Sequence, residues 1–130
     1  MLVNATNCCS FDAGEWSVVQ DDYVISMVSP EGSAELRVTA YDYGRSVTLT
    51  ELVQLAKNRA GESVEVMESN CGQYAGIAFR GVEDNLAYHT WYLTLAEILL
   101  DIELTCEDGN LDAHLKAAEA ILVTLRDTRP

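Results

Sequence analysis

The order of elements along this 130-residue chain predicts an α+β fold, in which a central antiparallel β-sheet of six to seven strands is flanked by two helices. Two groups of strand-like segments, rich in β-branched and aromatic residues, are each followed by an amphipathic helical pattern. The predicted order is β-β-β-α-β-β-β-β-α. No repeat or low-complexity tract divides the chain, so residues 1–130 are expected to form a single domain.

The first three strands are predicted from short β-favouring segments and the turns between them. Trp16–Val19 and Tyr23–Val28 flank a polar tripeptide and predict a hairpin. After a turn at Ser29–Gly32, the segment Ala34–Tyr41 alternates apolar and polar residues, so one face of this strand is expected to lie on the core. Residues 1–14 show no such pattern and are expected to form an irregular N-terminal segment.

The first helix is predicted over Leu49–Ala60, where apolar residues recur at helical spacing. Thr48 and Glu51 have the spacing of a capping box, which satisfies two free backbone N–H groups at a helix start. Gly61 stands where a C-cap belongs. These signals fix both ends of the helix.

The second group of strands is predicted at Ser63–Glu68, Gln73–Val82, Leu86–Thr94 and Ile98–Cys106. A glycine inside the second of them, Gly76, indicates a bulge or a close neighbour. The last two segments are separated by no breaker residue. A turn is placed between them because a single strand over both would be far longer than strands usually are.

The closing helix is predicted to begin after Asn110, which is expected to cap it. Arg126 and Arg129 are expected near its end, where positive charge suits the helix dipole. Its apolar residues form one stripe, which consists of Leu111, Leu115, Ala118, Ile121, Leu122 and Leu125.

The chain is strongly acidic, with 21 acidic and 8 basic residues and a formal net charge of −13. A negative field repels phosphate backbones and anionic lipid surfaces, so neither a nucleic acid nor a membrane is expected as a partner. A basic protein partner would be drawn in faster. In a second interpretation, the acidity only keeps the protein soluble or reflects an acidic proteome. This interpretation is favoured, because net charge affects solubility more directly than it identifies a partner.

Four cysteines are present, but their spacing matches no metal site. Cys71 and Cys106 lie at strand ends and are expected to be buried, reduced thiols, whereas the adjacent Cys8 and Cys9 are not expected to bond to each other. No phosphate-binding loop or nucleophile elbow occurs, so no cofactor, metal or catalytic residue is expected. The N-terminal residues do not form a signal peptide and no segment is apolar enough to span a membrane, which favours the cytoplasm.

Three parts of the chain carry a resemblance to a known family. Trp16–Pro30 runs from a strand pair into a Ser-Pro turn, and Ala34–Tyr41 is followed by the helix with Leu52 and Ala56. The remaining residues that carry it lie in the second half of the chain and are Trp91, Ile98–Cys106, His114 and Ile121–Arg126. In this order and hydrophobic pattern, the chain resembles PsbP-like domains over roughly residues 15–127.

PsbP-like domains include the photosystem oxygen-evolving subunit and the nuclear-transport factor Mog, and the bacterial DcrB-like proteins and type VI secretion chaperones are the most similar members. The resemblance implies a central antiparallel sheet with a helix on each side. It also implies binding and scaffolding rather than catalysis, because members of the group mostly hold partners. The family has no shared catalytic set that could be transferred to this chain, and no contact motif of the Mog type occurs in it.

Aromatic and acidic residues gather on the outward positions of the predicted sheet. Large rigid side chains can anchor a contact and charges can orient it, so this set is a candidate surface for a basic partner. Trp91 and Tyr92 are expected to pack under the helices instead, and Tyr41 and Tyr43 remain open between the two roles. The candidate partner-binding residues are Tyr41, Asp42, Tyr43, Glu83, Asp84, Tyr88, Asp101 and Glu103.

The sequence therefore favours a non-catalytic, acidic, cytoplasmic binding protein, acting in a bacterium as a toxin-immunity or effector-binding protein. Three alternatives remain. A secretion chaperone would hold an apolar effector segment and would need an exposed apolar surface. A small hydrolase would use His89, which is more simply interpreted as a hydrogen-bonded histidine within a strand. A structural subunit would dimerise through an edge strand, so the oligomeric state stays open between a monomer and a homodimer.

Overall fold

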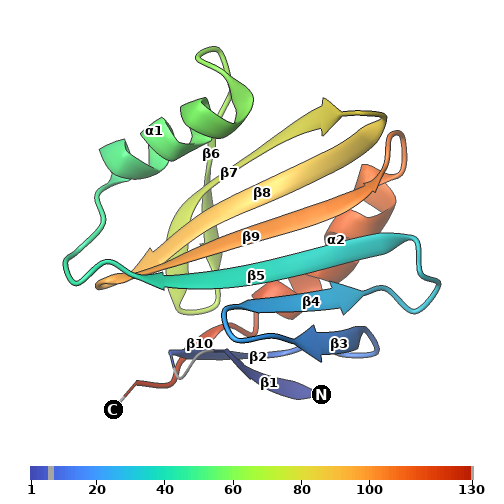
Figure 1. The fold of residues 1–130 in the computed structure, drawn as a ribbon, viewed down its shortest axis with the longest axis horizontal. Helices are drawn as coiled ribbons and strands as arrows, with labels where there is room; N and C mark the ends of the chain where they lie inside the picture. Colours follow the sequence, from blue (N-terminus) through green and yellow to red (C-terminus); the bar gives the residue numbers. More distant parts are fainter. Residues whose placement is uncertain (6–7, 130) are drawn as a thin grey trace.

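The computed structural model describes residues 1–5 and 8–129 and confirms the α+β prediction. Its main sheet is antiparallel and contains seven strands (Figure 1). In spatial order they are β3 (Ser17–Gln20), β4 (Val24–Val28), β5 (Ala34–Asp42), β9 (Ile98–Glu107), β8 (Leu86–Leu95), β7 (Tyr74–Glu83) and β6 (Met67–Cys71). The two long central strands β5 and β9 pair from Ala34–Cys106 to Asp42–Ile98, so most of their apolar residues lie on one face, and Leu99 lies on the other.

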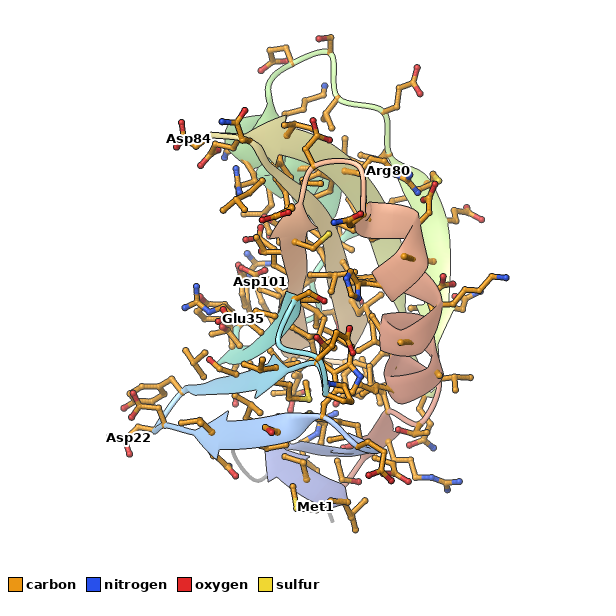
Figure 2. The ribbon with its side chains drawn as sticks, turned by 90° about the vertical axis from the view of Figure 1, so that its right-hand side faces the viewer. Met1, Asp22, Glu35, Arg80, Asp84 and Asp101 are labelled. Atoms are coloured by element: carbon orange, nitrogen blue, oxygen red, sulfur yellow. The ribbon has the colours of Figure 1, made fainter. Side chains whose placement is uncertain are left out.

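That face is covered by two elements. Helix α2 (Leu111–Leu122) lies on it and buries Ala118, Ile121 and Leu122. A small sheet of β1 (Leu2–Ala5), β2 (Cys9–Asp12) and β10 (Arg126–Asp127) contributes Phe11 to the same hydrophobic core. Figure 2 shows α2 lying along one side of the main sheet.

The other face is only partly covered. Helix α1 (Leu49–Ala60) packs Leu52 and Ala56 against Ile77 and Phe79 of β7 and against the buried tyrosines of β8. Over β5 and the part of β9 from Asp101 to Thr105, no element lies on this face among the described residues, and the side chains there are exposed or half-buried. We call this surface the open half, and its residues are Glu35, Arg37, Thr39, Tyr41, Asp101, Glu103 and Thr105.

The caps of α1 agree with the sequence. The Thr48 hydroxyl accepts a hydrogen bond from the Glu51 backbone N–H at 3.2 Å, and the Thr48 N–H donates to Glu51 at 3.2 Å. Arg45 binds both carboxylate oxygens of Glu51, at 2.8 and 2.7 Å, which lowers the pKa of that carboxyl to about 2. Gly61 ends the helix with a φ of 102°.

The expectation of an irregular segment over residues 1–14 is wrong. Strand β2 pairs with β1 on one side and with β10 on the other, and its residues Cys9 and Phe11 are fully buried. The partner β10 lies more than a hundred residues later and has only two residues. A strand whose pairing depends on so distant and short a partner leaves little local pattern in the sequence.

Two further boundaries differ from the prediction. The strand expected at Ser63–Glu68 is β6, which begins at Met67, because Val64 and Val66 pack against the cluster under α1 instead of joining the sheet. The closing helix ends at Leu122 and has no basic residue in its last turn. Arg126 lies in β10 instead, and the side chain of Asn110 makes no capping hydrogen bond.

Cys71 and Cys106, expected to be buried thiols, are 7% and 3% exposed and form no disulfide. In the described part of the chain, neither helix is long and apolar enough to cross a membrane.

Candidate binding surface

A half-buried arginine, Arg59, lies where α1 meets the open half. Arg59, in the last turn of α1, places its guanidinium 4.2 Å from the ring centroid of Tyr88. Its Nη1 lies 3.0 Å from Glu83, and its Nη2 lies 3.4 Å from Glu103. The Thr90 hydroxyl donates to the same Glu103 oxygen at 3.0 Å. The guanidinium thus rests on an aromatic ring between two carboxylates, an arrangement that combines cation–π attraction with ion pairing.

Gly81 makes room for this arrangement. It lies directly opposite Tyr88 in the β7–β8 pair, and a methyl group added there would overlap the end of the Tyr88 ring. The Tyr88 ring therefore lies over Gly81 of β7, and the Arg59 guanidinium lies above it. The ring centroids of Tyr88 and Phe79 are 6.4 Å apart, and the two rings are nearly perpendicular. Because Gly81 has no side chain, the Tyr88 ring can lie over it in the position that contacts Arg59.

We therefore expect Gly81→Ala to uncouple Arg59 from Tyr88. The far end of the ring can move aside, so the free energy of unfolding should fall by only about 1 kcal/mol, close to the value of a cation–π contact. Urea unfolding of Gly81→Ala, Arg59→Met and the double variant gives the coupling energy. Arg59→Met should cost less in the Gly81→Ala background, and equal costs in both backgrounds would contradict this role of Gly81.

Asp101 is the most unusual acid of the open half. It lies on β9 between Thr39 of β5 and Tyr92 of β8, and no described residue donates a hydrogen bond to its carboxylate. The pKa of Asp101 is raised to about 6, first by burial and then by the charge of Glu103, while Arg59 and Arg37 oppose the shift. The pKa of Tyr92 is raised to about 12, first by burial and then by Asp101.

Tyr41 lies at the outer end of the open half and is 47% exposed. It lines a cavity of about 460 Å³, together with Asp22 of the β3–β4 connection and Asp42. Tyr43 follows in the next loop, where its ring lies 5.7 Å from the guanidinium carbon of Arg45. The two tyrosines left open by the sequence are therefore both at the surface.

Acidic side chains extend along the whole of this side of the sheet. In Figure 2, Asp84, Asp101, Glu35 and Asp22 lie on the side away from α2. They come from the β7–β8 turn, β9, β5 and the β3–β4 connection, and therefore from opposite ends of the molecule. The negative charge is thus spread across the open half and beyond both of its ends.

The structure brings together five of the eight predicted partner-binding residues on one face, and these are Tyr41, Glu83, Tyr88, Asp101 and Glu103. Tyr88 is 6% exposed, so it supports Arg59 and offers little surface to a partner. Asp42 and Tyr43 lie at the end of β5, and Asp84 lies in the β7–β8 turn with a φ of 53°. Trp91 packs under α2 and Tyr92 in the cluster under α1, as expected.

Sequence reasoning missed Arg59, Gly81 and Asp22 as parts of this surface. The strand alternation placed the acids and tyrosines on one face, but it carries no information on which cation would reach them. A glycine opposite an aromatic residue was the one available signal, and it requires the register of β7 and β8.

His89 lies away from this surface, on the face covered by α2. It is 4% exposed, its ring lies 4.5 Å from Trp91, and its Nδ1 has no hydrogen-bond partner. Burial lowers the pKa of His89 to about 4, and the charge of Arg80 acts in the same direction. His89 does not line the cavity of about 460 Å³ beside Tyr41. In the described residues, no group of three or more metal-ligating side chains is arranged to hold an ion.

Two solved structures share this architecture. A crystal structure from Bacteroides thetaiotaomicron matches 92% of this chain with a TM-score of 0.65 and 16% sequence identity. This chain spans 44% of that protein's length. The solution structure of cyanobacterial PsbP (CyanoP) from Synechocystis matches 95% of this chain and 89% of its own, with a TM-score of 0.50 and 11% identity.

The chain has a PsbP-like fold. No family model matches the sequence, and no curated protein matches it. At these identities the PsbP-like likeness concerns the fold alone, so the role of the open half must be argued from its own residues.

Proposed function

We propose that this PsbP-like chain is a non-catalytic binding protein whose open half holds a basic segment of a protein partner, as a toxin-immunity or effector-binding protein would. The observation that carries the proposal is Asp101, a half-buried carboxylate with no hydrogen-bond donor among the described residues, on the part of the sheet face that α1 leaves uncovered. An unpaired acid in such a place is costly, and a cation from a partner would offset that cost.

The charges around Asp101 support a basic partner. The chain carries a net charge of −13, and acids continue from the open half to both ends of this side of the molecule. The two arginines near Asp101 are already engaged, since Arg37 lies 3.7 Å from Glu35 and Arg59 pairs with Glu83 and Glu103. A cation supplied from outside would therefore complement this face, and the long-range field would speed its approach.

The polar lining of the open half favours the immunity type of role over the chaperone type. A chaperone for an apolar effector segment, as the resemblance to type VI secretion chaperones suggests from the sequence, needs an apolar groove. Here the exposed positions are charged, hydroxyl-bearing or tyrosine side chains. The hydrolase alternative gains no support from His89, because this residue is buried and neutral and lies on the opposite face. A bacterial cytoplasm remains part of this proposal.

The proposal is tested by titrating the protein with a 20-residue peptide of mixed lysine and arginine in a calorimeter. We expect binding that weakens at least tenfold between 50 and 300 mM salt. We also expect Asp101→Asn/Glu103→Gln to weaken binding about tenfold at low salt. A glutamate peptide of equal length should not bind.

The matched control is Glu15→Gln/Glu119→Gln, which removes the same charge from exposed positions outside the open half. It should change affinity less than twofold. Since Glu103 also holds Arg59, the single variant Asp101→Asn separates lost binding from lost structure. Equal losses in the two double variants, or binding that is indifferent to salt, would overturn the proposal.

A further inference from the structure

The arginine site at Tyr88 shows how this face binds a guanidinium. Tyr88 and Glu103 are diagonal neighbours across β8 and β9, because Tyr88 pairs with Thr105 and Glu103 pairs with Thr90. On the other side, Tyr88 pairs with Gly81, which makes Glu83 its diagonal neighbour on β7. The chain's own Arg59 fills the space above this Glu83–Tyr88–Glu103 triplet.

A second triplet of one tyrosine and two acids, here the aspartates Asp22 and Asp101 with Tyr41, lies at the outer end of the open half. Tyr41 pairs with Leu99 and Thr39 pairs with Asp101, so Tyr41 and Asp101 are again diagonal neighbours, now across β5 and β9. On the other side, the β4–β5 register ends at the Val24–Thr39 pair. Asp22 lies in the turn before β4, where the Asp21 N–H donates to the Val24 carbonyl at 2.9 Å, and it lines the cavity of about 460 Å³ together with Tyr41.

Unlike the first triplet, the second has no arginine of the described residues paired with its acids. Arg37 on β5 lies against Glu35 at 3.7 Å. Arg129 lines the same cavity, but its guanidinium lies 2.7 Å from Glu97 and 3.0 Å from Asp127. Tyr41 keeps nearly half of its surface in solvent, whereas Tyr88 is buried beneath Arg59.

We propose that the open half recognises an arginine side chain of the basic partner, which lies on Tyr41 between Asp22 and Asp101 as Arg59 lies on Tyr88. This inference rests on the proposed function and specifies its partner chemistry. An arginine is preferred to a lysine because its planar guanidinium stacks on an aromatic ring while its fork of donors reaches two carboxylates. A lysine ammonium is compact, so it cannot reproduce both contacts at once.

The test compares two ten-residue peptides, one of arginine and one of lysine, which carry the same charge. We expect the arginine peptide to bind the wild-type protein about fivefold more tightly at 100 mM salt. Tyr41→Leu should remove this preference by weakening the arginine peptide alone. Tyr41→Phe, which keeps the ring, should retain the preference and is the matched control. Tyr41 is 47% exposed, so both variants are expected to fold.

The outcomes separate this inference from the proposed function. Equal affinity of the wild-type protein for the two peptides, with the expected salt dependence, would overturn the arginine site and leave a general basic-partner surface standing. An arginine preference that survives in Tyr41→Leu would also overturn it, because the preference would then arise elsewhere. If neither peptide binds, both the inference and the proposed function fail.

Discussion

Asp101→Asn is expected to raise the free energy of unfolding at pH 7 by about 2 kcal/mol. In the folded protein burial raises the pKa of Asp101 from 3.8 to about 6, and a shift of one pKa unit corresponds to about 1.4 kcal/mol. Partial access to solvent reduces the full value of the shift. Asparagine has nearly the same shape and no charge, so it removes the cost of keeping a carboxylate in this position.

The pH dependence follows from the sign of the shift. Between pH 3.8 and about 6 the folded state holds a proton on Asp101 that the unfolded chain has lost, so stability falls as the pH rises through this range. The folded and unfolded asparagine variants bind no proton at this position. The unfolding free energies of the two proteins should therefore converge near pH 4 and separate above pH 6. Urea unfolding between pH 4 and 8, followed by tryptophan fluorescence, measures both curves.

His89 acts in the opposite direction and must be included in that measurement. The pKa of His89 is lowered from 6.5 to about 4. Between these pH values the unfolded chain binds a proton at His89 and the folded state does not, so the free energy of unfolding falls as the pH drops from 6.5 to 4. In the wild-type protein the two effects, each of about 2–3 kcal/mol, largely cancel. Asp101→Asn should expose the acid sensitivity that His89 causes.

Glu35→Gln is the control for the asparagine variant, because Glu35 is an exposed acid on the same face. It should change stability by less than about 0.5 kcal/mol at any of these pH values. A loss of stability in Asp101→Asn at pH 7 would show that the carboxylate is well solvated or paired. If Asp101→Asn raises the free energy of unfolding and also weakens peptide binding, then Asp101 serves binding at the expense of stability.

Gly76→Ala is expected to lower the free energy of unfolding by roughly 3 kcal/mol, which corresponds to roughly 10 °C in the melting temperature. Gly76 pairs with Leu93 near the start of β7 and the end of β8, and an added methyl group would overlap the backbone carbonyl of Tyr92. Neither strand can yield easily, because β8 is hydrogen-bonded to β9 along its whole length. From the sequence, Gly76 indicated either a bulge or a close neighbour. The pairing of β7 with β8 is unbroken, so there is no bulge, and the close neighbour is the Tyr92 backbone.

Thermal unfolding followed by circular dichroism measures this effect, and Gly32→Ala controls for it. Gly32 has a φ of 78°, but an added methyl group there would meet no atom within 4 Å. Gly32→Ala should lower the free energy of unfolding by roughly 1 kcal/mol, through backbone strain alone. Similar costs for the two variants would mean that the overlap at Gly76 is relieved by a small movement of β8.

Local patterns predicted the parts of this fold that depend on neighbours in sequence. The alternation in Ala34–Tyr41 identified the core face of β5, and the Thr48–Glu51 spacing identified the start of α1. The small sheet and the start of β6 depend on tertiary contacts and were not predicted. For the candidate site, alternation put Asp101 and Glu103 on one face, but only the position of α1 over β7 brings Arg59 to them.

The pairing of β2 with β10 has a consequence for synthesis in the cell. Cys9 pairs with Asp127, so about 117 residues must be translated after β2 emerges before its second neighbour exists. At a translation rate of about 10 residues per second, this interval is roughly ten seconds. During it, Phe11 and the thiol of Cys9 stand unprotected on the nascent polypeptide, open to oxidants and to contacts with other chains near the ribosome.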